Sequence, residues 1–190
     1  MKIPLKNKKI SSRFSRAGFH NLPQVHPAAG KADSAKVRPV KSGDLKILSG
    51  IYAKTFNSMP LREKWTDKSA RELLQFFLEQ SGICLVAEYK SRPVGAIFTL
   101  VKPWWDGNHL SDGEFFVDPA YQKMGIGTEL LKALLKVAIK KYNALNWEAF
   151  TFKKSKYPLE WYKRLGLREV EELVIISGKV KKIIKNLENR

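Results

Sequence analysis

The chain has 190 residues, of which 44% are hydrophobic, which is typical of one globular domain with a substantial core. No apolar run approaches the ~20 residues needed to cross a bilayer, and no signal-type apolar block lies near the N-terminus, so we expect a soluble, cytoplasmic protein. The single cysteine, Cys84, excludes an internal disulfide and a cysteine-based zinc site, and we expect no metal.

The formal net charge of +17 is concentrated at the two ends of the chain. Residues 1–38 contain nine Lys or Arg residues and one acid, and residues 178–190 contain five and one. The middle of the chain is therefore only mildly basic. It suits an anionic cofactor, whereas contact of the basic ends with nucleic acid or an anionic membrane remains open.

Residues 1–34 have no lasting hydrophobic periodicity and no acid before Asp33. We expect a flexible basic arm. The richness in Arg and Ser also fits a transit peptide, but Met1–Pro4 does not begin a convincing amphipathic helix, so a solvated arm is favoured.

From residue 36 onward the periodicity is regular. A capping box at Ser69 and Glu72 marks the start of the second helix, and Pro93 opens the second strand of a hairpin. In chain order we expect a strand at 37–40, a helix at 42–57, a helix from about 69 to 81, and strands at 83–89 and 94–101.

The second half continues with a tryptophan-containing loop and a glycine turn. We expect a loop at 102–111, a strand at 114–117, a helix at 127–142, a strand at 147–152, a short helix at 158–165 and closing strands within 167–177. The strands at 114–117 and 147–152 are separated by the length of a right-handed parallel crossover. We therefore predict that they are neighbours in a mixed α/β sheet.

Residues 178–190 have the pattern of a basic amphipathic helix. The apolar residues recur at helical spacing among four lysines, and they are Val180, Ile183, Ile184 and Leu187. Docking on the domain or on a second subunit is the simpler interpretation of such a short helix.

The most informative segment is the glycine turn Gln122–Thr128, between a strand and a helix. A helix start exposes about four N–H groups and the positive end of the helix dipole, and glycine lets a ligand approach the backbone. The P-loop pattern fails because one residue separates Gly125 from Gly127, and the dinucleotide pattern fails at Leu130. An anion site and a merely tight turn are the two interpretations that remain.

Two motifs resemble the GNAT superfamily of N-acetyltransferases. They are Val-Asp-Pro-Ala-Tyr-Gln-Lys-Met-Gly-Ile-Gly-Thr at 117–128 and Trp-Tyr-Lys-Arg-Leu-Gly-Leu at 161–167. The resemblance covers roughly residues 36–177. It implies a domain at 35–177 with a mostly antiparallel sheet, a splayed parallel central pair and flanking helices, and transfer of acetyl from acetyl-CoA to a primary amine by direct attack in a ternary complex.

The resemblance also implies the cofactor-binding residues. Main-chain amides of the turn would wrap the pyrophosphate, and the backbone of the preceding strand would pair with the pantetheine arm as an added strand does. Many relatives have an asparagine where this chain has Ser155, whose hydroxyl could replace part of that contact. The residues so implied are Phe115, Phe116, Val117, Gln122, Lys123, Met124, Gly125, Ile126, Gly127, Thr128 and Ser155.

For the chemistry, Tyr162 takes the family's position for the general acid near the sulfur, with Tyr157 a weaker substitute. Glu114 is the first choice for the base, although it could equally orient the substrate ammonium. Glu148 is its rival, and Asp112 is close in sequence but could simply terminate the loop. An ordinary carboxylate is a poor base for an ammonium, so a water chain or a raised pKa is required. The N–H of Val117 is the implied oxyanion donor.

Trp104, Trp105 and Asp106 lie where the family often has its acceptor loop, and aromatic faces with a carboxylate suit a cationic amine. The two tryptophans could equally pack the loop onto the core. Together with residues 61–65, the region faintly resembles aminoglycoside acetyltransferases, although a small molecule or a protein amine both fit, and a homodimer is open. The alternative function is a non-catalytic acyl-CoA-binding module whose basic ends bind nucleic acid or an anionic surface.

Overall fold

The computed structural model describes residues 35–58, 63–153 and 156–188. Within them the strands are β1 (Lys36–Pro39), β2 (Gly82–Tyr89), β3 (Arg92–Trp104), β4 (Gly107–Val117) and β5 (Ala144–Trp147). The helices are α1 (Leu45–Asn57), α2 (Asp67–Glu79), α3 (Ile126–Tyr142), α4 (Lys156–Arg164) and α5 (Val180–Glu188), with short 3-10 turns at Ser42–Asp44 and Pro119–Tyr121.

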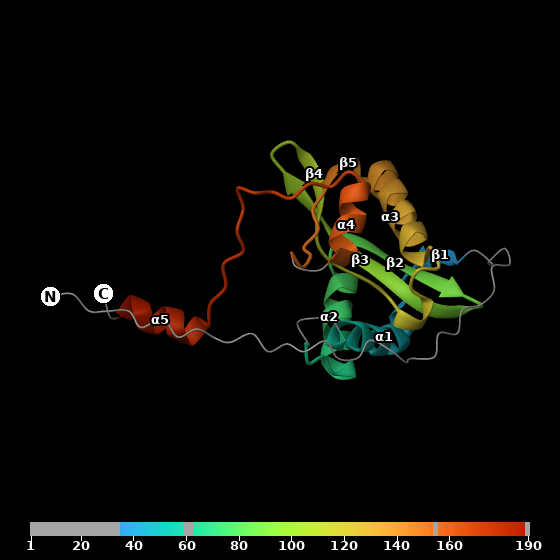
Figure 1. Cartoon of the computed structure of the whole chain (residues 1–190), viewed down its shortest axis with the longest axis horizontal. Coiled ribbons are helices and arrows are strands. Elements are labelled where there is room, and N and C mark those ends of the chain that lie inside the picture. Colours follow the sequence, from blue (N-terminus) through green and yellow to red (C-terminus); the bar gives the residue numbers. More distant parts are fainter. Residues whose placement is uncertain (1–34, 59–62, 154–155, 189–190) are drawn as a thin grey trace. The chain divides into compact units, whose positions relative to one another are not determined.

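The strands form one sheet in the order β1-β2-β3-β4-β5 (Figure 1). The first four are antiparallel to their neighbours, whereas β5 runs parallel to β4 and is connected to it through α3. The mixed α/β fold and the parallel neighbours expected from the sequence are therefore confirmed. The β2–β3 hairpin turns at Lys90 and Ser91, whose φ angles of 50° and 62° match the twist of the flanking strands.

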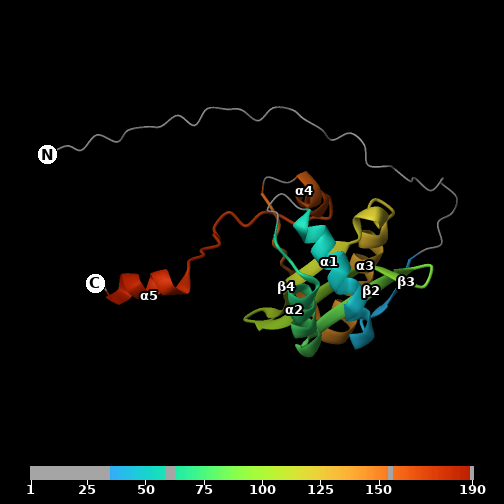
Figure 2. The same ribbon diagram turned by 90° about the horizontal axis from the view of Figure 1, so that it is seen from below.

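Helices cover both faces of the sheet. The apolar sides of α1 and α2 pack on one face, and α3 packs on the other (Figures 1 and 2). Period-2 alternation divides the strands between these two cores, so that Phe98 and Phe116 face α1 and α2 while Ile97 and Leu110 face α3. The two cores meet only through the sheet, which fixes the position of β4 from both sides.

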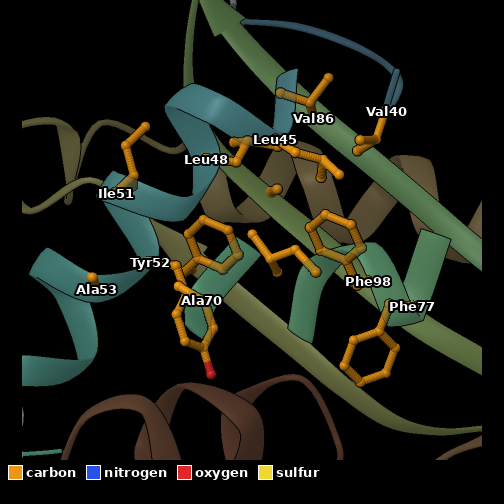
Figure 3. Close-up of a cluster of buried hydrophobic side chains, with 13 residues drawn as sticks. Val40, Leu45, Leu48, Ile51, Tyr52, Ala53, Ala70, Phe77, Val86 and Phe98 are labelled. Carbon is orange, nitrogen blue, oxygen red and sulfur yellow. The ribbon is translucent and has the colours of Figure 1, made fainter. Parts of the chain in front are cut away.

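The core on the side of α1 is dominated by aromatic and aliphatic side chains (Figure 3). Leu48 and Leu74 are fully buried, and burial of such a side chain stabilises the fold by about 1.5–3 kcal/mol. Tyr52 is 2% exposed, and its ring makes edge contacts with Phe116 and Trp65. Its hydroxyl points away from the other side chains of the cluster (Figure 3), which leaves it free to bond to a polar partner.

The capping box predicted at Ser69 and Glu72 was wrong, because α2 begins one turn earlier. Thr66 Oγ1 accepts from the Ser69 amide at 3.1 Å, and Ser69 Oγ accepts from the Thr66 amide at 3.0 Å. The reciprocal pair therefore uses two hydroxyls, and Ser69 occupies the place that a glutamate or glutamine usually takes.

The predicted loop at 102–111 was also wrong. The β3–β4 ladder continues to Trp104 opposite Gly107, so only Trp105 and Asp106 turn the hairpin. Alternation supports the longer strand, because Leu110 is buried against α3. The pattern was missed because Trp104 and Trp105 were interpreted as part of a loop.

The last two predicted strand regions need correction as well. β5 starts directly after the αL residue Asn143 that ends α3, so the strand covers 144–147 and not 147–152. Residues 167–179 contain no helix or strand, and the apolar run Leu173–Ile176 is exposed. The helix expected in the tail is present as α5, with its apolar side chains exposed. In the described residues no helix combines the length and the apolar character that crossing a membrane requires.

Candidate active site

The site begins where β4 and β5 separate. They pair only along Asn108–Leu110, and the last backbone bond between these segments runs from the Glu148 amide to the Leu110 carbonyl at 2.8 Å. Directly beyond it β4 has a bulge at Asp112, whose φ is 42°. Because a bulge bends its strand and increases the local twist, β4 turns away from the chain that follows β5.

Gly113 allows the bulged strand to stay against β3. A Cβ at this position would lie 2.2 Å from the carbonyl oxygen of Phe98, which is backbone and cannot move aside. Any side chain at this position would therefore push β4 off its neighbour. The glycine fixes the point of divergence.

A cavity of about 310 Å³ lies at this divergence. Its polar groups come from three strands or strand ends and from α4, and its remaining wall is apolar. The lining residues are Phe56, Ile97, Phe98, Thr99, Gly113, Glu114, Phe115, Trp147, Glu148, Ala149, Phe150, Thr151, Phe152, Pro158, Tyr162 and Ile175.

Glu114 is the most perturbed acid in the cavity. Its carboxylate accepts a hydrogen bond from the Tyr52 hydroxyl at 2.9 Å, across 62 residues of sequence. Burial raises the pKa of Glu114 to about 7, even though the bond from Tyr52 opposes the rise. A carboxyl group with that pKa exchanges protons near neutral pH, which an ordinary glutamate cannot do efficiently for an amine.

Tyr162 lies on α4 and is 8% exposed. Its ring packs edge-on against Trp147 at 5.5 Å and beside Trp161 at 5.2 Å, so that β5 and α4 hold it together. Burial raises the pKa of Tyr162 to about 12, with Tyr157 adding to the rise. The phenol therefore keeps its proton at neutral pH and can act as a donor in the cavity.

Glu148 is held by a buried histidine. His109 Nδ1 lies 3.0 Å from Glu148 Oε1, and His109 Nε2 lies 2.8 Å from Asp106 Oδ1 and 3.0 Å from Asn146 Nδ2. The bond to Glu148, together with that to Asp106, raises the pKa of His109 although burial of the ring opposes it. The imidazole thereby connects the hairpin tip to the cavity wall.

The turn before α3 presents backbone and no side-chain cap. Gly125 is the N-cap residue with φ 81°, which favours glycine, and a Cβ there would meet no atom within 4 Å. In the described residues the N-cap position has no side-chain cap bond, and the first helical bond of α3 runs from the Glu129 amide to the Gly125 carbonyl. Gln122 Nε2 donates to the Val117 carbonyl at 3.0 Å and ties the turn to β4. This arrangement fits an anionic group in the open space beside Gly125.

The edge of β4 between the turn and the cavity is open. The Asp118 amide donates to the Val94 carbonyl on the β3 side, so by strand alternation the backbone groups of Val117 and Phe115 point to the opposite side. That side has no strand partner among the described residues. An extended ligand could pair there, whereas Phe116 directs its side chain into the core.

The remaining residues predicted for the site are distributed as follows. Lys123 is exposed with φ 64°, Ile126 is buried under the turn, and Met124 and Thr128 are half-buried. Asp112 is exposed at the bulge, Tyr157 lies ahead of the helical part of α4, and Ser155 lies outside the described residues.

None of the hairpin residues predicted to bind substrate lines the cavity. Trp105 is 88% exposed, Trp104 is 48% exposed beside Lys102 and His109, and Asp106 reaches the cavity only through the imidazole. Sequence reasoning missed His109, the bond from Tyr52 and the hydroxyl of Thr151. A correct strand assignment for 107–117 would have placed His109 at a buried position beside β5.

Comparison with known proteins supports this picture. The model of the acetyltransferase (GNAT) family matches residues 49–167. No curated protein sequence matches at a significant level. A possible acetyltransferase from Clostridium difficile 630 has a similar structure, with a TM-score of 0.65 and 16% identity over 77% of this chain and 98% of that chain.

Two aminoglycoside enzymes have the same fold. The aminoglycoside antibiotic 6'-N-acetyltransferase from Acinetobacter haemolyticus has a TM-score of 0.58 and 17% identity, over 76% of this chain and 99% of that chain. The enzyme AAC(6')-Iy, in complex with a bisubstrate analogue of CoA and acetylneamine, has a TM-score of 0.59 and 14% identity, over 76% and 98%. At these identities the likeness establishes the fold alone.

The family match covers well over half of the chain and includes β4, the turn and all of α4. The chain therefore belongs to the acetyltransferase (GNAT) family, whose members bind acetyl-CoA and transfer its acyl group.

Proposed function

We propose that this protein is an N-acetyltransferase that transfers acetyl from acetyl-CoA to a primary amine by direct attack. The observation that carries the proposal is that Glu114 and Tyr162 line one cavity and that the strand containing Glu114 leads to an uncapped glycine turn. One group suits proton removal at neutral pH and the other keeps a proton to donate. Glu114 and Tyr162 are 48 residues apart in the sequence, and the family resemblance had suggested both as catalytic residues.

The cofactor fits the residues that are present. The N–H groups at the start of α3, from Gly125 to Thr128, would hold the pyrophosphate, because the space beside Gly125 is open and no side chain competes for them. The backbone of Phe115 would pair with the pantetheine arm along the open edge of β4, which Val117 shares. Lys123 would add positive charge beside the turn. When bound, acetyl-CoA supplies the acetyl group as a reactive thioester.

Glu114 would receive the proton of the acceptor ammonium, either directly or through water. Its raised pKa reduces the difference from the pKa of an amine, which is near 10. The hydrogen bond from Tyr52 orients the carboxylate. Glu148, the rival predicted from sequence, is more exposed and held by His109, which suits binding of a cation better than accepting a proton.

Two donors complete the chemistry. The N–H of Val117 points to the open side of β4 and would stabilise the oxyanion of the attacked carbonyl. Tyr162 would donate a hydrogen bond or its proton to the leaving sulfur, as the resemblance implies, and solvent would return that proton; the raised pKa keeps the phenol protonated until the thiolate forms. Neither step requires a metal ion.

The test is incubation of the protein with acetyl-CoA and a panel of amines, with release of free thiol as the readout. The panel contains alkyl monoamines, diamines, an aminoglycoside and a lysine peptide. We expect turnover with at least one amine. Binding of acetyl-CoA by calorimetry without turnover of any amine would instead favour the alternative, a module that only senses acyl-CoA.

A further inference from the structure

The charge of the cavity wall contrasts with that of the whole protein. The chain has a net charge of +17, yet the cavity wall contains two carboxyl groups, Glu114 and Glu148, and no Lys, Arg or His among its described residues. Aromatic rings supply much of the remaining wall. Carboxylates and aromatic faces together attract a cation and disfavour an anionic acceptor.

The two carboxyl groups occupy different environments. Glu114 is half-buried and bonded to Tyr52, whereas the side chain of Glu148 is 59% exposed. The position of Glu114 suits proton exchange with the reacting nitrogen, whereas the exposed carboxyl group of Glu148 is accessible to a second group of the acceptor. One cavity therefore contains an inner acid for the reacting nitrogen and an outer carboxylate with a different role.

His109 keeps the outer carboxylate in place in either protonation state. When the ring is cationic, its Nδ1–H donates to Glu148 and its Nε2–H donates to Asp106. When the ring is neutral with its proton on Nδ1, that N–H still donates to Glu148 and Nε2 can accept from the Asn146 amide, but the bond to Asp106 is lost. The His109 ring is buried and has partners on both nitrogens, so it orients Glu148 more firmly than a partner at the protein surface would.

A further polar group of the wall has no partner. The Oγ1 atom of Thr151 is buried and makes no hydrogen bond within the described part of the chain. Thr151 lies three residues after Glu148 on the same wall. A buried hydroxyl without a partner is costly, and a ligand N–H group would satisfy it.

We propose that Glu148, positioned by His109, binds a second ammonium group of the acceptor, so that diamines and larger polyamines are preferred over monoamines. This inference rests on the proposed function, because it takes the cavity as the acceptor site. Asp106 has a positioning role through His109, which explains how a residue at the hairpin tip affects acceptor choice without lining the cavity.

The test compares diamines of three to six carbons with monoamines of equal length. Calorimetry in the presence of CoA measures their affinities for the wild type and for three variants. Glu148→Gln removes the charge. His109→Asn keeps an amide N–H near the place of Nδ1, and His109→Gln keeps one near the place of Nε2, so the first retains the contact with Glu148 and the second loses it.

We expect at least one diamine to bind the wild type about 10-fold more tightly than its monoamine, a typical gain for one well-placed ion pair. Glu148→Gln and His109→Gln should reduce that ratio to about 1–3, and His109→Asn should restore most of it. CoA affinity should not change, and monoamine affinity should fall much less than diamine affinity. A role of His109 in folding alone would lower all affinities together.

Equal binding of diamines and monoamines to the wild type at every length would overturn the inference, and so would an unchanged ratio in Glu148→Gln. An unchanged ratio in His109→Gln would overturn the role of the imidazole. These outcomes are separate from the proposed function, which fails when CoA binds but no amine in the panel releases thiol.

Discussion

We have proposed that the turn Gln122–Thr128 and the cavity wall belong to one site, and the two are built differently. The turn is seven consecutive residues, and its main feature is the backbone at Gly125. The wall is assembled from α1, β3, β4, the end of β5 and α4, and its main features are side chains. A local motif is readable from sequence, whereas an assembled wall depends on strand register and on where the sheet opens.

This difference predicts a division of labour. Changes in the turn should alter cofactor affinity and leave the chemistry intact, because backbone amides contact a part of the ligand far from the reacting atoms. Changes in the wall should alter the rate or the choice of amine with little effect on cofactor binding.

The largest effect is expected for Tyr162→Phe. Loss of the hydroxyl should lower kcat about 100-fold or more, as removal of a general acid typically does, while the Kd of acetyl-CoA stays within about twofold. Free-thiol release and calorimetry measure the two quantities. Phe retains the packing against Trp147 and Trp161, so an unchanged kcat would remove the phenol from the mechanism.

Replacement of Glu114 by Gln should stabilise the fold at neutral pH. The pKa of Glu114 in the folded protein, about 7, lies above its ordinary value of 4.5, so the folded state is the one that binds the proton more tightly. Its ionisation therefore costs stability progressively as pH rises from about 4.5 to 7, and the cost is complete above 7. The variant should exceed the wild type by up to about 3 kcal/mol at pH 8 and by almost nothing at pH 4.

Urea denaturation at a series of pH values measures that difference. A gap that is constant with pH would show that the carboxyl group has an ordinary pKa in the fold. The wild type and the variant are worth comparing because a residue whose ionised form lowers the stability of the fold is retained for function and not for packing.

In the turn, Gly125→Ala should raise the Kd of acetyl-CoA about 10-fold, because the left-handed conformation costs about 1–2 kcal/mol for a residue with a Cβ. The matched control is Gly50→Ala, at a helical position in α1 where an added Cβ also meets nothing within 4 Å. The control should stabilise the fold by about 0.5–1 kcal/mol without affecting cofactor affinity. Equal effects of both changes on the Kd would contradict the role of the turn.

The smallest effect is expected for Tyr52→Phe. Removal of the hydroxyl abolishes a bond that lowers the pKa of Glu114, so the midpoint of the pH–rate profile should move upward. A hydrogen bond to a charged group contributes about 1.5 kcal/mol, which corresponds to roughly one pH unit. A downward movement would mean that Glu114 is not the titrating group.

Sequence alone predicted the parts of this molecule that depend on local pattern. The helix α3 with its glycine turn and the β2–β3 hairpin were predicted within a few residues, and the parallel pairing of β4 with β5 was predicted although the bounds of both strands were wrong. Each has a signal within one window, such as Pro93 at a strand start or apolar residues at helical spacing in 127–142.

The parts that sequence did not predict depend on long-range contacts. The bulge at Asp112 has no local signature, yet it decides where β4 leaves β5 and hence where the cavity lies. The bond between Tyr52 and Glu114 joins a helix to a strand across the core, and the site of His109 depends on the ladder reaching the hairpin tip. Hydroxyl caps at Thr66 and Ser69 were missed because the expected partner at the third position was an acid.

The most direct test of the account is the pH dependence of kcat for the wild type and for Glu114→Gln, with the best amine of the panel and saturating acetyl-CoA. We predict that kcat of the wild type rises with a midpoint near the pKa of Glu114, about 7, and that the variant loses this limb along with most of its activity. An identical profile in both proteins would contradict the claim that Glu114 receives the acceptor's proton in this cavity.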